Sequence, residues 1–176
     1  LYALGFTKEK IIETFYTTNK YSYDINKKNW VTDFNPENYK RPIKISYDLI
    51  DSVNGKKILS KGEKLNIVIA RKLQEKGLKS IVVSNDEIIG KYLSKDIKDK
   101  SGQNIVAAGF DITEEQLNKI ISQEEQTLHI VNIDPINKGP YILESLKADK
   151  NLNKSDALND IYKILRKLNI KGCKII

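Results

Sequence analysis

The sequence predicts an α+β fold in which short antiparallel strands alternate with three to four helices. Two observations carry this prediction: a strand-turn-strand-helix-strand pattern that occurs twice, and an amphipathic helix pattern near each end of the chain. The turns at Gly55 and Gly102 leave no room for a parallel crossover, so the strands beside them are expected to pair antiparallel. We therefore expect a duplicated unit inserted between two terminal segments that pack together.

The first helix is predicted over about residues 8–16, because Thr7 is a good N-cap for it. A last helix is predicted over about residues 155–168. Each helix has apolar side chains spaced to form one face. These are Ile11, Ile12, Phe15 and Tyr16 in the first helix, and Leu158, Ile161, Leu165 and Leu168 in the last.

An aromatic stretch over residues 21–34 follows the first helix and predicts a hairpin. Tyr21 and Tyr23 alternate as in a strand, and the polar run Asn26–Asn29 supplies the turn. Such aromatic side chains could stack on nucleic-acid bases, but no arginines are interleaved with them. We therefore favour packing in a core and a sheet.

The repeat becomes visible when Gly55 is laid on Gly102, a shift of 47 residues. The same shift matches Ile50 with Ile97, Ile58 with Ile105, Gly62 with Gly109, Leu65 with Ile112, and Leu73 with Ile120. The two units cover about residues 44–83 and 91–131.

Each unit should contain one helix. The first is expected to begin after Asn66 and stop at Gly77, and the second to begin after Thr113, which forms a capping box with Gln116. A repeated folding unit of this kind predicts a scaffold or a docking surface, because nothing that is repeated in both copies is a nucleophile, a general base or a metal ligand.

Basic residues give the 176-residue chain a net charge of +7, which suggests nucleic-acid binding as one interpretation. Only three of the 30 basic residues are arginines, however, and direct base reading favours the guanidinium group. A solvated lysine-rich surface is the other interpretation. If a contact surface for nucleic acid or a protein factor exists, we expect it to involve Lys56, Lys57, Lys61, Lys64 and Arg71.

Groups that could support catalysis or metal binding are few. Aspartates recur near the turns of both units, where a turn role is favoured over a paired-carboxylate site. They are Asp48, Asp51, Asp96 and Asp99. His129 is predicted on the last strand of the second unit, and the single cysteine, Cys173, lacks a histidine at any recognisable zinc or nucleophile spacing. A small-molecule enzyme is therefore disfavoured.

The chain contains no methionine and opens on Leu1 directly before a helix start, which predicts a piece of a longer protein. No apolar run approaches the roughly 20 residues of a membrane span. We expect a cytoplasmic protein with no membrane partner.

Several short stretches occur in the same order in one known family. They are Leu1–Thr7 with Ile11–Tyr16, Pro36-Glu37, Ser46–Asp48, Lys61-Gly62 with Ala70–Leu73, Gly90–Ile97, and Gly139–Ile142 with Ala148-Asp149 and Ile161-Tyr162. Together they resemble the bacterial DNA-directed RNA polymerase β subunit, from the helix that leads into its inserted external domain to the return from that domain.

This chain departs from the family pattern at three places. The arginine-rich stretch of the family is replaced by Pro36–Pro42, and an aspartate-histidine pair is replaced by Asn137-Lys138. After Arg166, the family's proline-rich run is missing, and residues 169–176 form a tail of uncertain origin. Contacts that the family makes through those arginines are therefore not carried over.

The resemblance implies a discontinuous segment of the β lobe, residues 1–18 with 137–168, and an inserted domain over residues 19–136. It implies an architectural role beside the downstream DNA channel and a docking surface for regulatory transcription factors, in an assembled nucleotidyltransferase. Its partners would be the β′, α, ω and σ subunits and DNA. The catalytic magnesium is held by β′, so this segment would carry neither catalytic residues nor a cofactor. The alternative is a freestanding basic domain that binds nucleic acid.

Overall fold

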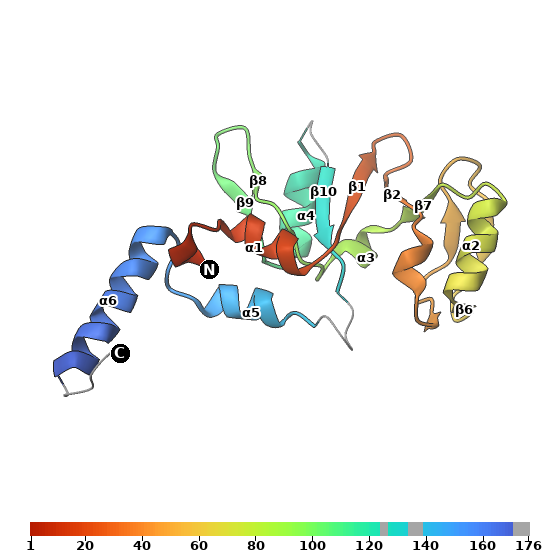
Figure 1. Cartoon of the computed structure of the whole chain (residues 1–176). Helices are drawn as coiled ribbons and strands as arrows, with labels where there is room; N and C mark the ends of the chain where they lie inside the picture. Colours follow the sequence, from red (N-terminus) through yellow and green to blue (C-terminus); the bar gives the residue numbers. More distant parts are fainter. Residues whose placement is uncertain (124–126, 134–138, 171–176) are drawn as a thin grey trace. The chain divides into compact units, whose positions relative to one another are not determined.

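The structure, a computed structural model, describes residues 1–123, 127–133 and 139–170, with side chains up to residue 167 (Figure 1). The predictions about Asn137-Lys138, Cys173, most of the tail, and Leu168 as part of a helix face lie outside the described residues. Within them, the α+β class is confirmed by antiparallel sheets and separate helices.

The chain divides into two compact units. Unit 1 comprises Leu1–Tyr16 and Ile133–Ile176, and unit 2 comprises Thr17–Asn132.

Unit 1 is helical in the described residues. Its elements are the 3-10 helix η1 (Tyr2–Leu4) and the α-helices α1 (Lys8–Phe15), α5 (Tyr141–Ala148) and α6 (Lys154–Ile170). Helix α1 begins as predicted, since the Thr7 side chain accepts a hydrogen bond from Lys10 N–H. Helices α1 and α5 pack together around the buried side chains of Ile11, Ile12 and Leu143.

Helix α6 leaves its apolar face uncovered in the described part of the chain. It contacts η1. The side chains that the sequence predicts on one face nevertheless remain 47% (Leu158), 45% (Ile161) and 41% (Leu165) exposed. A helix normally buries such a stripe against another element.

Unit 2 contains ten strands, three α-helices and one 3-10 helix in its described residues. The strands are β1 (Thr18–Asp24), β2 (Asn29–Asp33), β3 (Ile43–Lys44), β4 (Leu49–Asp51), β5 (Lys57–Leu59), β6 (Lys64–Leu65), β7 (Ser80–Val83), β8 (Ile97–Lys98), β9 (Asn104–Val106) and β10 (Thr127–Val131). The helices are η2 (Pro36–Tyr39), α2 (Ile67–Glu75), α3 (Asn85–Ile88) and α4 (Glu114–Ile121).

Six of these strands form one antiparallel sheet in the order β10-β1-β2-β7-β4-β5. The predicted hairpin is the β1-β2 pair, in which Tyr23 lies opposite Trp30. β10, the last strand of unit 2, pairs with β1, its first (Figure 1). Just beyond this pair, Asn132 N–H donates to the Thr17 carbonyl oxygen over 2.8 Å. The chain therefore enters and leaves unit 2 at adjacent positions.

The core of unit 2 confirms the packing interpretation of the aromatic stretch. Tyr21, Trp30 and Phe34 are buried in one apolar cluster that includes side chains of both repeats. The Trp30 indole also satisfies its polar edge, because Nε1–H donates to Asn85 Oδ1 over 3.0 Å. These rings are therefore not available as a base-stacking surface.

The two repeats have corresponding elements, but with a change of register that the sequence comparison missed. From β5 and β9 onwards the shift of 47 holds, and Gly62 and Gly109 both have positive φ, 89° and 80°, before the helix. Before the turn, however, Leu49 pairs with Leu59 as Ile97 pairs with Val106, a shift of 48. The match of Ile50 with Ile97 is therefore wrong, and Ile50 corresponds to Lys98. The physical reason is a second turn that is one residue shorter.

The described residues contain six α-helices where three to four were predicted. The additional ones are α3 and α5. α3 is a single turn closed by a capping box between Ser84 and Glu87, and so has no periodic pattern to reveal it. α5 follows Pro140, its N-cap residue, and was not recognised in the sequence.

Candidate functional site

The five basic residues proposed as a contact surface are all exposed, and two of them, Lys57 and Lys61, contact the same carboxylate. Lys57 Nζ is 2.8 Å from Asp48 Oδ2. Lys61 donates its backbone N–H to Asp48 Oδ1 over 2.8 Å. The hydrogen bond from Lys57, reinforced by that from Lys61, holds the pKa of the Asp48 carboxyl below its usual value. The Lys57 charge is thus matched within the unit.

Arg71 belongs to a separate ionic group. Its Nη2 is 3.0 Å from Glu37 Oε1, and Lys40 Nζ is 3.2 Å from Glu37 Oε2. The hydrogen bonds from Arg71 and then Lys40 lower the pKa of Glu37. This guanidinium is therefore engaged with a carboxylate of its own chain.

Lys64 and Lys56 lie apart from these two ionic groups, each with different neighbours. Lys64 faces Lys44 across the β3-β6 ribbon. Lys56 lines a cavity of about 510 Å³ beside Lys76 and Lys79, near the end of α2. The five residues are therefore distributed over several local environments. Their role as a contact surface for nucleic acid or a protein factor stays a prediction.

The recurring aspartates confirm the turn interpretation. Asp51 Oδ1 accepts from Val53 N–H, and Asp99 Oδ1 accepts from the N–H groups of Ser101 and Gln103. Asp96 Oδ1 accepts from Ala108 N–H over 2.7 Å, as Asp48 accepts from Lys61. Hydrogen bonds from Ser101 and Gln103 also lower the pKa of Asp99. Each carboxylate thus stabilises the loop of its own repeat.

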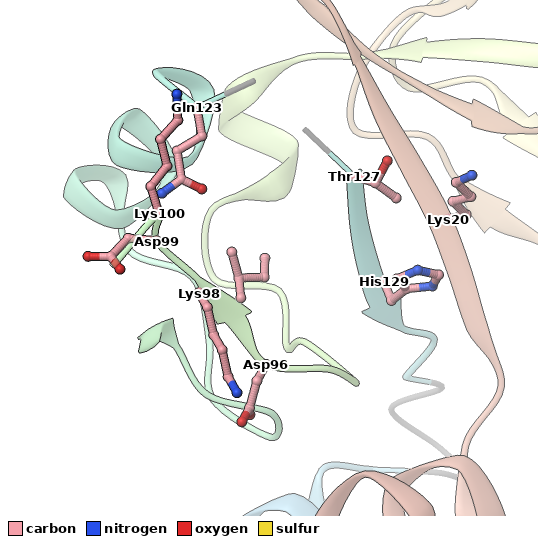
Figure 2. Close-up of a pocket in the computed structure, with 9 residues that line it drawn as sticks. Lys20, Asp96, Lys98, Asp99, Lys100, Gln123, Thr127 and His129 are labelled. Carbon is pink, nitrogen blue, oxygen red and sulfur yellow. The ribbon is translucent and has the colours of Figure 1, made fainter. Parts of the chain in front are cut away.

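A second cavity, of about 570 Å³, lies at the β10 edge of the six-stranded sheet. Its lining comprises Lys20, Asp96, Ile97, Lys98, Asp99, Lys100, Gln123, Thr127 and His129. Figure 2 shows Asp96, Lys98, Asp99 and Lys100 on one side of the cavity, and Lys20, Thr127 and His129 on the other. His129 lies on β10, as predicted.

Sequence reasoning missed this cavity and its lysines. Lys20 lies opposite His129 in the β1-β10 ladder, a pairing between residues distant in the chain. Lys98 and Lys100 occupy the positions of Ile50 and Ser52 in the first repeat, once the shorter turn is taken into account. A search for charge differences between the two copies would have found them.

Metal and membrane features are absent from the described ranges. Residues 1–123, 127–133 and 139–170 contain no group of three or more His, Cys, Asp or Glu side chains placed to hold a metal ion. In the same ranges, no helix combines the length and apolar character that a membrane crossing requires.

Comparison with known proteins agrees with the resemblance in the sequence. No family model matches the chain. It is 38% identical over 167 residues to the DNA-directed RNA polymerase subunit beta of Rhizobium leguminosarum, and 37% identical over 167 residues to that of Ehrlichia ruminantium. It is 34% identical over 178 residues to that of Cereibacter sphaeroides.

Each match covers 94% of this chain but only 12% or 13% of the relative. Such identity over nearly the whole chain exceeds what a shared fold alone would give. The chain therefore belongs to the family of DNA-directed RNA polymerase β subunits and corresponds to one segment of them.

Proposed function

We propose that the chain acts as an architectural segment of the β subunit in an assembled, cytoplasmic DNA-directed RNA polymerase. Unit 1 would form part of the β lobe beside the downstream DNA channel, and unit 2 an inserted domain whose surface receives regulatory transcription factors. The observation that carries this proposal is the identity of 34–38% to polymerase β subunits over 94% of the chain.

The exposed face of α6 supports an architectural role. Leu158, Ile161 and Leu165 present an apolar stripe that the described residues leave uncovered. Because the relatives are about eight times longer than the matched segment, the rest of a β subunit offers ample surface to cover it. Burying one such side chain contributes roughly 1.5–3 kcal/mol.

Catalysis would reside elsewhere in the assembly. In this proposal the β′ subunit holds the catalytic magnesium, and the α, ω and σ subunits and DNA complete the enzyme. The described carboxylates support that division, since Asp48, Asp51, Asp96 and Asp99 are committed to backbone N–H groups of their own loops. This segment would then contribute shape and contacts to transcription without a cofactor of its own.

The test is a hybrid polymerase. The matching segment of the Rhizobium leguminosarum β subunit is replaced by this chain, and the hybrid is reconstituted with β′, α and ω. We expect template-directed RNA synthesis by the hybrid, its loss when the segment is deleted, and none by the isolated chain. RNA synthesis by the isolated chain, or full activity after deletion, would refute the proposal.

A further inference from the structure

The cavity beside β10 lies where the second repeat lacks a ladder that the first repeat forms. In the first repeat, β4 pairs with β7, and the Ser52 and Ser80 hydroxyls are hydrogen-bonded just beyond this ladder. In the second repeat the described strands β8 and β10 do not pair, and the residues of both line the cavity. The corresponding positions are Ile50 and Lys98, Val82 and His129, Ser52 and Lys100, and Ser80 and Thr127.

Side chains and backbone bonds both keep the two strands apart. An apolar Ile50-Val82 pair in the first repeat becomes Lys98 and His129 in the second, which removes the apolar contact that favours pairing. In addition, Ser94 N–H donates to the His129 carbonyl oxygen, and Val131 N–H donates to the Tyr92 carbonyl oxygen, each over 2.8 Å. Residues 92–94 therefore take the part of the β10 edge that β8 would need.

Among the described residues, one position of that edge is left without a partner on the cavity side. His129 and Val131 direct backbone groups to the outer edge, so Thr127, two residues earlier, does the same by the alternation of antiparallel ladders. No hydrogen bond of the Thr127 N–H or carbonyl oxygen is found among the described residues outside the β1-β10 pair. A donor beside an acceptor at a sheet edge matches a peptide backbone, whereas a phosphate group would use the donor alone.

The charged side chains that line the cavity indicate which side chains such a peptide would carry. Lys20 and Lys98 line it from opposite sides, and neither belongs to an ion pair in the described residues. Asp96 and Asp99 accept backbone hydrogen bonds from Ala108, Ser101 and Gln103, so their negative charge is partly compensated. Acidic side chains are therefore the complement of this lining.

We propose that the cavity of about 570 Å³ lined by residues of β8 and β10 binds an acidic, extended segment of a partner protein. The segment pairs its backbone with Thr127 and directs carboxylates to Lys20 and Lys98. This inference names where and by what chemistry a factor docks, and so rests on the docking role proposed above. The hybrid polymerase tests that role, whereas the experiment below uses the isolated full chain, so that the two can fail separately.

The probe is a fluorescein-labelled peptide of alternating glutamate and valine, titrated with the chain and followed by fluorescence anisotropy. The test variant, Lys98→Ile with Lys100→Ser, carries the residues of the first repeat. We expect it to weaken binding about fivefold, as the loss of the exposed ion pair to Lys98 would. The matched control, Lys72→Ile with Lys150→Ser, removes the same charge outside the cavity and should bind as the parent does. Trp30 fluorescence verifies folding of every variant.

Changes in the peptide keep the test independent of protein folding. Glutamine in place of glutamate, and N-methylation of the peptide backbone, should each weaken binding. A Lys20→Gln variant should do so as well. Equal binding by the glutamine peptide or by the Lys98→Ile, Lys100→Ser variant would overturn the proposal. The proposal would also be overturned if the acidic peptide did not bind. It would be overturned as well if a single-stranded oligonucleotide bound more tightly to the same lysines and displaced the peptide.

Discussion

The hydroxyl of Tyr16 donates a 2.7 Å hydrogen bond to the carbonyl oxygen of Gly139, and it accepts one of 3.3 Å from Ile142 N–H. Tyr16 is buried at the end of α1, and Ile142 lies in the first turn of α5. One side chain thus satisfies two backbone groups on the opposite terminal segment of the chain. These two bonds join the two pieces of unit 1, together with the packing of α1 against α5 and of α6 against η1.

Replacing Tyr16 with phenylalanine should therefore lower the stability of unit 1 by about 1–3 kcal/mol, because buried backbone groups lose their partner. Urea denaturation followed by far-ultraviolet circular dichroism measures the change. Tyr162→Phe is the matched control, since the Tyr162 side chain is exposed on α6. Equal stability of the two variants would contradict the role assigned to Tyr16.

Stability should also depend on the charge of Asp48. The pKa of its carboxyl is lowered by Lys57 and by the Lys61 N–H, so its charged form stabilises the fold. That contribution is present above the unfolded value of about 4 and is lost as the pH falls through the folded pKa. Asp48→Asn should therefore destabilise unit 2 at neutral pH, with a difference that shrinks on acidification.

Denaturation at several pH values, together with a carbon-13 titration of the carboxyl group, measures this effect. Asp33→Asn, at an exposed position ending β2, is the matched control for the loss of one exposed carboxylate. A difference between Asp48→Asn and the parent that persists unchanged at acid pH would show that the charge is not responsible.

The capping box of α4 provides a third prediction. Thr113 and Gln116 exchange hydrogen bonds between side chain and backbone, which satisfies two otherwise free N–H groups at the helix start. Thr113→Ala should cost about 1 kcal/mol, whereas Thr113→Ser should retain most of the stability. Trp30, the single tryptophan, shares the core with Leu117 and Ile120 of α4 and reports the transition by fluorescence.

A substitution on the apolar face of α6 should affect assembly of the segment into a β subunit but not its own folding. Ile161→Lys should change the stability of the isolated chain by less than about 0.5 kcal/mol, because the side chain is already exposed. In the hybrid β subunit, the same change should reduce assembly with β′ more than about tenfold, since a lysine would be buried without a partner. Asn159→Lys, at an exposed polar position of α6, is the control. Normal assembly with Ile161→Lys would mean that this face stays uncovered.

Structural features that depend on residues close together in the chain could be predicted from the sequence. The caps at Thr7 and Thr113 and the β1-β2 hairpin depend on side chains within a few positions of one another, and all three were predicted. Pairing of β10 with β1 was not, because no local pattern states which distant strands meet. Since that pairing brings Lys20 to the cavity, the place of Lys20 in its lining could not be predicted for the same reason.

The register error in the repeat has a different origin. Aligning Gly55 with Gly102 is correct for the turn, but the second turn lacks one residue, and a fixed shift then misplaces everything before it. Because residues 50 and 97 are both isoleucine, the register error could not be recognised from the sequence. Only hydrogen-bond partners identify Lys98 as the counterpart of Ile50.

The hydrogen bond between Thr17 and Asn132 places both ends of unit 2 at one spot. A host protein therefore needs to open only a single surface loop to accommodate all of the residues from Thr17 to Asn132. Gain or loss of the whole module would leave the geometry of the host chain nearly unchanged. Lineages could accordingly acquire, exchange or discard such a module as a whole, and change its outer face without altering the fold of the protein that carries it.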